Sequence, residues 1–202
     1  DFWNWLQQEN GAGQMTCGRV LDLGAGWHPS IPLLWYAFGN DQQTLVDVFP
    51  NMDAGKVRDT TDFFRALANT PGWAGHPFIK RLPAAFDTSA GDVSMMLNSL
   101  GIEYRAPYGD FLKTRPGQYE IVTCTQVLQH IPKAVQLAIF RELYACMQPG
   151  GLFHATVHFV GQFRSPVLQQ GQYEHLRYAP EIWEKWINSS LMSFNRLKGP
   201  DY

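Results

Sequence analysis

The sequence has little cysteine, no strong charge of either sign and no long apolar run. Its three cysteines, Cys17, Cys124 and Cys146, form no Cys-x-x-Cys pair, which is typical of reduced, mostly buried thiols in a cytoplasmic protein. No segment is apolar for long enough to span a membrane, and no signal peptide is recognisable. The net charge of −2 provides no basic footprint. These absences predict a cytoplasmic protein without a membrane partner and argue against a nucleic-acid partner.

What the sequence does contain is the composition of one globular α/β domain over residues 1–202, with 45% hydrophobic and 17% charged residues. The chain starts at Asp1 and not at methionine, which is typical of a trimmed chain. Apolar runs predict strands at 19–24, 43–49, 102–106, 119–125 and 152–159. Helices are predicted at 1–11, 30–39, 56–68, 92–100, 132–147 and within 181–190. This alternation indicates a doubly wound, mostly parallel sheet with helices on both faces.

Several local features fix the expected ends and faces of these elements. Ser30 is predicted to cap the helix at 30–39, and Pro149-Gly150-Gly151 is predicted to separate the long helix from the fifth strand. The apolar positions of that helix recur at four-residue spacing, at Val135, Ile139, Leu143 and Met147. Trp183 and Trp186, three apart on the last helix, are expected to pack against a core or lid.

The loop after the first strand carries the first functional signal, in the stretch VLDLGAGWHP. Gly24 and Gly26 allow a sharp turn and a close approach of a ligand, but Pro29 stands where a dinucleotide loop has its third glycine. Asp22 precedes the loop, and at ~4 Å a carboxylate would repel a diphosphate by roughly 4 kcal/mol. The same carboxylate suits a cationic ligand that lacks phosphate, such as S-adenosylmethionine.

Further acidic residues follow the next two strands. Asp47 stands at the end of the second strand, where a carboxylate can accept hydrogen bonds from both hydroxyls of a ribose. Asp110 follows the third strand and is placed to accept from an exocyclic adenine amine, with Phe111 near the ring. Gly-Asp at 109–110 is also an ordinary turn sequence, so that second interpretation stays open. The acids do not resemble a metal cluster, and no metal is predicted.

Four segments in this order, VLDLGAG, LVDVF, YEIVTCTQVLQHIPK and MQPGGLFHATV, resemble the class I S-adenosylmethionine-dependent methyltransferases. The resemblance covers residues 17–158 and implies a Rossmann-like fold and S-adenosylmethionine as cofactor. It departs from the family at His28, where a third glycine is frequent. The residues implied in cofactor binding are Asp22, Gly24, Ala25 and Gly26 on the methionine part, Asp47 and Val48 at the ribose, Asp110 and Phe111 at adenine, and Thr125 and Gln126 beside the methionine.

Two histidines are candidate catalytic bases. His130 stands at the start of the helix after the fourth strand, and His158 at or near the end of the fifth. His154 would share a face with His158 but lie deeper, and His28 is a further candidate for a ligand contact. An alcohol acceptor must lose a proton, which a histidine with a near-neutral pKa can accept.

The predicted function is methyl transfer to an O or N atom of a small-molecule or sugar-like acceptor. No Asn/Asp-Pro-Pro-aromatic motif follows the fourth strand, which argues against amino methylation of nucleobases. Two alternatives remain: an NAD(P)-dependent oxidoreductase, disfavoured by Asp22 and Pro29, and a catalytically inactive methyltransferase-like subunit that binds a nucleoside.

Around the core, residues 53–100 read as an insertion and 160–202 as an aromatic, lid-like segment. The family's sheet normally has seven strands, and only five are readable here. We therefore expect that the C-terminal strands are missing from this chain, or that a partner covers the open sheet edge and makes an oligomer.

Overall fold

Five parallel strands form a single sheet in the order β3-β2-β1-β4-β5. The computed structural model describes residues 18–71, 81–83, 91–159, 176, 178–188 and 194–201. The strands are β1 Val20–Leu23, β2 Gln43–Val46, β3 Ile102–Arg105, β4 Tyr119–Thr125 and β5 Met147–Thr156. All five predicted strands are confirmed, with shifted ends. The helix expected at 1–11, Cys17 and most of the loop at 70–92 lie outside the described residues.

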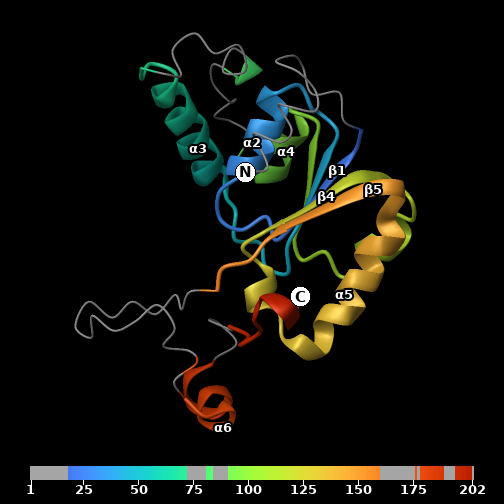
Figure 1. The fold of residues 1–202 in the computed structure, drawn as a ribbon. Helices are drawn as coiled ribbons and strands as arrows, with labels where there is room; N and C mark the ends of the chain where they lie inside the picture. The colour runs from blue at the N-terminus through green and yellow to red at the C-terminus, as the bar shows by residue number, and fades with distance from the viewer. Residues whose placement is uncertain are drawn as a thin grey trace, which may run out of the picture.

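Helices cover both faces of this sheet. Their bounds are α2 Ser30–Ala37, α3 Ala54–Leu67, α4 Val93–Asn98, α5 Lys133–Cys146 and α6 Pro180–Ile182, which continues as a π-helix over Trp183–Ile187. Short 3-10 turns are η2 Phe111–Thr114, η3 Leu128–His130 and η6 Gly199–Asp201. Figure 1 shows α2, α3 and α4 on one side of the sheet and α5 on the other. The doubly wound α/β prediction is therefore confirmed.

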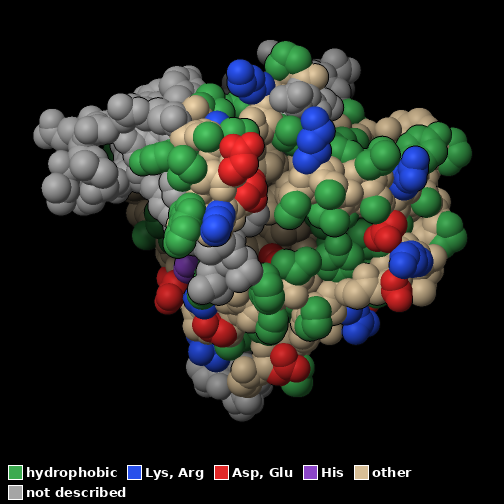
Figure 2. Space-filling view, turned by 90° about the horizontal axis from the view of Figure 1, so that it is seen from below, with side chains coloured by type: hydrophobic (Ala, Val, Ile, Leu, Met, Phe, Trp, Pro, Cys, Tyr) green, Lys and Arg blue, Asp and Glu red, His purple; other side chains and the backbone are tan. Residues whose placement is uncertain are grey.

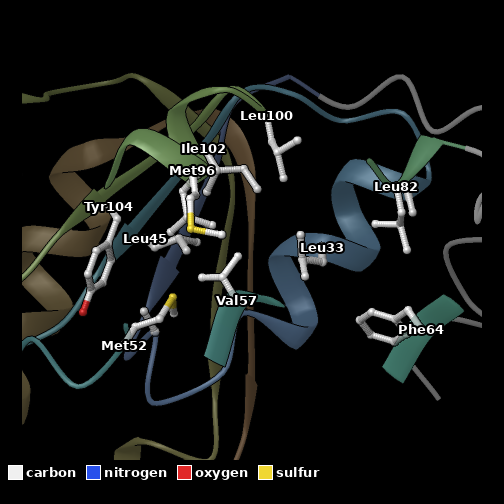
Figure 3. Close-up of a cluster of buried hydrophobic side chains, with 13 residues drawn as sticks. Leu33, Leu45, Met52, Val57, Phe64, Leu82, Met96, Leu100, Ile102 and Tyr104 are labelled. Carbon is white, nitrogen blue, oxygen red and sulfur yellow. The ribbon is translucent and has the colours of Figure 1, made fainter. Parts of the chain in front are cut away.

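The larger core lies between the sheet and α2, α3 and α4. In Figure 3, Leu33, Leu45, Val57 and Ile102 point toward one another from two helices and two strands. Each of the four is almost completely buried, and burying such a side chain contributes about 1.5–3 kcal/mol. The described part of residues 53–100 thus supplies α3 and α4 to the main core. A second core lies between the sheet and α5, with Leu21, Val122 and Leu143 among its members.

Helix ends follow local hydrogen bonding, with one prediction corrected. Asp53 accepts from Lys56 N at 2.9 Å and starts α3, and Asp92 accepts from Ser94 N at 2.9 Å and starts α4. The prediction of Ser30 as an N-cap was wrong, because Ser30 is the first helical residue and Pro29 holds the cap position without a side-chain bond. The Ser30 N–H donates to the His28 carbonyl at 2.9 Å, so the turn before the helix supplies its partner.

Strand β5 begins earlier and ends earlier than the sequence predicts. It starts at Met147, directly after α5, so Pro149-Gly150-Gly151 lies inside the strand and does not precede it. Gly150 has a φ of +80°, and the register against β4 shifts between Tyr119 and Ile121, which absorbs the extra residues as a bulge. The strand ends at Thr156, so His158 lies beyond it.

Strand β5 is one of the two edge strands of the sheet, and β3 is the other. Among the described residues no strand pairs with its outer side, and Leu152 is 36% exposed there. Covering of this edge by a partner stays a prediction.

Two predicted apolar contacts were wrong. Val135 is 45% exposed, because the inward face of α5 is formed by Gln136, Leu143 and Cys146. Trp183 is buried as expected, but Trp186 is 74% exposed. No helix within the described ranges is long and apolar enough to cross a membrane.

Candidate active site

The candidate site lies at the carboxyl ends of β1, β2 and β4. In parallel sheets these ends open on one edge, and ligands bind where the strand order reverses, here between β1 and β4. Figure 2 views the molecule from below Figure 1 and shows a hollow surrounded by hydrophobic side chains, with an acidic side chain at its floor.

Gly24 and Gly26, the two glycines of the loop after β1, have different structural roles. Both have positive φ, +85° at Gly24 and +64° at Gly26, a region that costs other residues strain. A Cβ atom on Gly24 would lie 2.2 Å from Val127 Cγ2, so Gly24 is needed for packing against the turn after β4. A Cβ atom on Gly26 would find only Gly24 O, at 3.9 Å. The space in front of Gly26 is open, as close approach of a ligand requires.

Asp47 ties this loop to the end of β2. Its Oδ2 accepts from Gly26 N at 2.8 Å, and its Oδ1 accepts from Phe49 N at 3.1 Å. The residue is 8% exposed. Each carboxylate oxygen has a further lone pair, so the group can also accept from two ligand hydroxyls.

Asp22 is a buried carboxylate on β1. Its Oδ1 accepts from Thr123 Oγ1 at 2.6 Å, and the residue is 6% exposed. Burial raises the pKa of Asp22 to about 6, against the lowering effect of the Thr123 bond, and the charge of Asp47 raises it further. Two buried acids at one edge favour a cationic ligand, because a positive charge would relieve their repulsion. Thr123 was missed by sequence reasoning, because its contact depends on the register of β1 against β4.

The turn after β4 contains a strained residue. Gln126 has a φ of +57°, the only positive value at a non-glycine residue within the described ranges. Such a conformation costs on the order of 1–3 kcal/mol and is concentrated at functional sites. Gln126 N donates to Thr156 O at 2.9 Å, and Gln129 Nε2 donates to Gln126 O at 2.7 Å. Thr125 and Gln126 therefore stand at the candidate site in a conformation fixed by their neighbours.

The structure does not bring Asp110 and Phe111 into this group. The Asp110 carboxylate pairs with Lys113, whose hydrogen bond lowers the pKa of Asp110, and faces solvent. The Phe111 ring packs 4.6 Å from the guanidinium of Arg115 and 5.6 Å from that of Arg105. From this loop, Tyr108 reaches the site, since its N–H donates to Asp47 O at 3.1 Å. An adenine contact by Asp110 and Phe111 stays a prediction.

The two histidines proposed as bases both contact Gln129, whose Nε2 lies 3.4 Å from His130 Nε2. The His130 ring meets the edge of Phe194, with centroids 6.0 Å apart. His158 is exposed beyond β5, and its N–H donates to Gln129 Oε1 at 3.5 Å. His154 is half-buried in β5, and burial lowers its pKa.

His28 has a defined hydrogen-bonding partner in α3. Its Nδ1 lies 3.2 Å from Thr60 Oγ1, and the Thr60 hydroxyl already donates to Lys56 O at 2.7 Å. With the Thr60 hydroxyl donating to Lys56 O, the His28 tautomer that satisfies this contact carries its proton on Nδ1. A neutral His28 then has its lone pair on Nε2.

The loops after β1 and β2 carry exposed apolar side chains. Trp27, Val48 and Phe49 are each 58% exposed, and Lys56 Nζ lies 4.4 Å from the centre of the Trp27 ring. Phe49 was missed by sequence reasoning, although an aromatic residue two positions after the acid that follows β2 was a readable signal. Across the described segments no group of three or more His, Cys, Asp or Glu residues could hold a metal ion. Burial raises the pKa of Cys124 to about 12, so this thiol is a packing residue.

A parallel sheet with glycines and buried acids at one carboxyl edge defines a class of nucleoside-binding α/β proteins. Within that class, the family model of the methyltransferase domain matches residues 6–190 of this chain. The chain belongs to this family of methyltransferase domains.

Individual known proteins are more distant. A ubiquinone biosynthesis O-methyltransferase of Bordetella pertussis is 36% identical over 59 residues, which are 28% of this chain and 24% of that protein. The chain thus matches about a quarter of the length of this curated relative. A putative sarcosine dimethylglycine methyltransferase from Galdieria sulphuraria has 18% identity and a TM-score of 0.40, over 76% of this chain and 45% of that one.

A second solved structure is an N-methyltransferase of Haemonchus contortus in complex with phosphomonomethylethanolamine and S-adenosylhomocysteine. It has 19% identity and a TM-score of 0.43, over 82% of this chain and 31% of that one. The fold assignment itself rests on the strand order given above.

Proposed function

We propose that this domain transfers a methyl group from S-adenosylmethionine to an oxygen or nitrogen atom of a small-molecule or sugar-like acceptor. The observation that carries the proposal is the pair of buried acids, Asp22 and Asp47, beside the open space at Gly26. A small-molecule acceptor is supported by two features of the sequence. Thr125-Gln126-Val127-Leu128 stands in place of the Asn/Asp-Pro-Pro-aromatic motif of nucleobase methylation, and the net charge of −2 argues against a nucleic-acid substrate. The relative matched over 59 residues is named as an O-methyltransferase.

The residues present fit the cofactor, and buried Asp22 is the clearest reason. The ammonium and sulfonium of S-adenosylmethionine supply the positive charge that this carboxylate lacks. We place the methionine part against Asp22 and the loop Gly24-Ala25-Gly26, bordered by Thr125 and Gln126. The free lone pairs of Asp47 would accept from the ribose hydroxyls, next to Val48.

The bound cofactor supplies a methyl carbon on a positively charged sulfur, and the chain must align an acceptor with it and exclude water. Trp27, Val48 and Phe49 offer exposed apolar surface for that purpose. For a hydroxyl acceptor, His130 or His158 would take the proton, and His28 Nε2 is a further acceptor atom at this edge. The test is a screen of hydroxyl- and amine-bearing small molecules for cofactor-dependent formation of S-adenosylhomocysteine. Turnover with nucleobases alone would contradict the proposed acceptor class.

The alternative of an NAD(P)-dependent oxidoreductase remains disfavoured by buried Asp22 and by Pro29 at the third glycine position. A methyltransferase-like subunit without catalysis would bind the cofactor but give no turnover in any acceptor screen.

Cofactor affinity is expected to fall as the pH drops below about 6, because the pKa of Asp22 lies near that value. Above it the carboxylate is ionised and attracts the cationic ligand; below it the carboxyl is neutral. A bound cation lowers the pKa of Asp22, so binding below pH 6 releases a proton. The dissociation constant should therefore rise by up to about tenfold for each unit by which the pH falls below 6. Calorimetry with S-adenosylmethionine in buffers of different ionisation enthalpy measures both effects. Asp22→Asn, which cannot titrate, should bind weakly and without this pH dependence; a profile like that of the unmodified chain would contradict the assignment.

Either His130→Ala or His158→Ala is expected to reduce turnover of a hydroxyl acceptor by about 10²–10⁴-fold. General-base catalysis contributes a factor of this size, and we assign the base to one of these two histidines. The dissociation constant of the cofactor should stay within a few-fold, since neither ring is assigned to bind it. The matched control is His154→Ala, whose half-buried ring lies within β5. Unchanged turnover in both variants would remove these two histidines from the mechanism.

A further inference from the structure

The C-terminal segment, residues 194–201, contacts the turn that joins β4 to α5, residues 126–131, mainly through Asn195. Asn195 N donates to Gln129 O at 2.6 Å, and Asn195 Nδ2 donates to the carbonyls of Leu128 at 2.6 Å and Ile131 at 2.9 Å. The same side chain accepts from Leu197 N through Oδ1 at 3.1 Å. Asn195 is 8% exposed, so these bonds are shielded from competing water.

Two other buried amides hold the same turn from the inside. Gln136 Nε2, on α5, donates to the carbonyls of Leu128 at 3.1 Å and Ile131 at 2.9 Å, the two carbonyls that Asn195 also uses. Gln129 is 1% exposed and bonds Gln126 O. A hydrogen-bonded network of this kind fixes one backbone conformation, because leaving any member unpaired in the interior is costly.

The segment is itself anchored to the π-helix that follows α6 and to Asn188 at its end. Trp183 is 2% exposed, and its Nε1 donates to Phe194 O at 3.1 Å. Phe194 N donates to Asn188 Oδ1 at 2.8 Å, and the Phe194 ring meets the edge of His130. Trp183 and Asn188 thus hold Phe194, and the neighbouring Asn195 in turn holds the turn at residues 126–131.

At its other end the turn meets the candidate cofactor loop. Its first residue is Gln126, with the strained φ of +57°, and its second is Val127, which packs against Gly24 so closely that a methyl group there would overlap. A shift of the turn would therefore move both the Gln126 backbone and the support behind the glycine loop.

We propose that Asn195 is a positioning residue, through which the C-terminal segment holds residues 126–131 in the conformation that binds the cofactor. The inference rests on the cofactor site proposed above and adds a part of the chain that the site itself does not contain. Because such coupling is reciprocal, bound cofactor should also stabilise the docked segment.

The first test compares Asn195→Ala with Arg196→Ala by calorimetry with S-adenosylhomocysteine. Asn195→Ala removes the two side-chain hydrogen bonds from Nδ2 to the turn and keeps the backbone bond to Gln129 O. The Arg196 guanidinium donates to Leu176 O at 3.3 Å, so Arg196→Ala leaves the hydrogen bonds of the turn untouched. We expect Asn195→Ala to raise the dissociation constant about fivefold or more and Arg196→Ala to leave it unchanged. A purely structural role would lower the unfolding temperature of Asn195→Ala with and without ligand equally, at an unchanged dissociation constant, and would overturn the inference.

The second test uses the unmodified chain, so that a folding defect cannot decide the result. Hydrogen exchange at the Asn195 and Leu197 amides should slow by about fivefold or more when S-adenosylhomocysteine binds. Normal ligand binding with unchanged exchange at both amides would overturn this inference and leave the proposed function standing. Failure of the unmodified, folded chain to bind the ligand would overturn both.

Discussion

Replacing Asp47 by alanine is expected to weaken binding of S-adenosylmethionine by about 10²–10⁴-fold. Hydrogen bonds to a charged acceptor are worth about 1.5–3 kcal/mol each, and we assign two ribose hydroxyls to this carboxylate. The loss is enlarged because Asp47 also accepts from Gly26 N and Phe49 N, which would be left without this acceptor at the ends of two loops. Isothermal titration calorimetry at neutral pH measures the change directly.

A matched control is Asp41→Ala, which removes one exposed carboxylate near the start of β2, at the opposite edge of the sheet. It should bind the cofactor like the unmodified chain. Asp47→Asn retains one acceptor oxygen and should fall between the two. Equal affinity in Asp47→Ala and Asp41→Ala, with both chains folded, would remove Asp47 from the cofactor site.

Replacing Gly24 by alanine is expected to cost the fold about 2–5 kcal/mol, from about 1–2 for the positive φ and about 1–3 for overlap with Val127. For a domain of this size that lowers the unfolding temperature by about 4–20 °C. Differential scanning calorimetry of the ligand-free chain measures it.

The two sources of that cost can be separated. Val127→Ala in the Gly24→Ala background should recover the part due to overlap and leave the backbone part. Gly26→Ala should cost only about 1–2 kcal/mol, because its Cβ atom meets open space, yet it should weaken cofactor binding by filling that space. If Gly26→Ala binds the cofactor with normal affinity, the cofactor does not occupy the open space in front of Gly26.

Much of the architecture was predictable because the signals are local. Apolar runs and glycine breaks located all five strands, and a buried parallel sheet needs such runs whatever its neighbours are. Asp22 and Asp47 were singled out because an acid within or just after an apolar strand has few structural reasons to be there. The structure buries both, and their cofactor contacts stay a prediction.

Some features could not be predicted, and several of these depend on contacts between distant parts of the chain. The sequence cannot show that Thr123 meets Asp22, since that requires the register of two strands. Asp110 was undecided for a local reason, because Gly-Asp suits both a ligand and a turn; its carboxylate pairs with Lys113, three residues on, and its adenine contact stays a prediction. The early start of β5 depends on a bulge at Gly150, where a local reading of Pro-Gly-Gly suggests only a break.

The buried amides show the same limit. Asn195 and Gln129 read as ordinary polar residues in the sequence, and only the fold brings one against the backbone of the other. A polar residue that becomes buried far from any motif has no local signature.

We propose that the carboxyl edge of β1, β2 and β4 binds a cationic nucleoside and not a dinucleotide. Calorimetric titration of the folded chain with S-adenosylmethionine, and in parallel with NADH, tests it most directly. We expect one-to-one binding of S-adenosylmethionine in the micromolar range or tighter, and no measurable binding of NADH. Binding of NADH in preference, or no binding of S-adenosylmethionine at millimolar concentration, would contradict it.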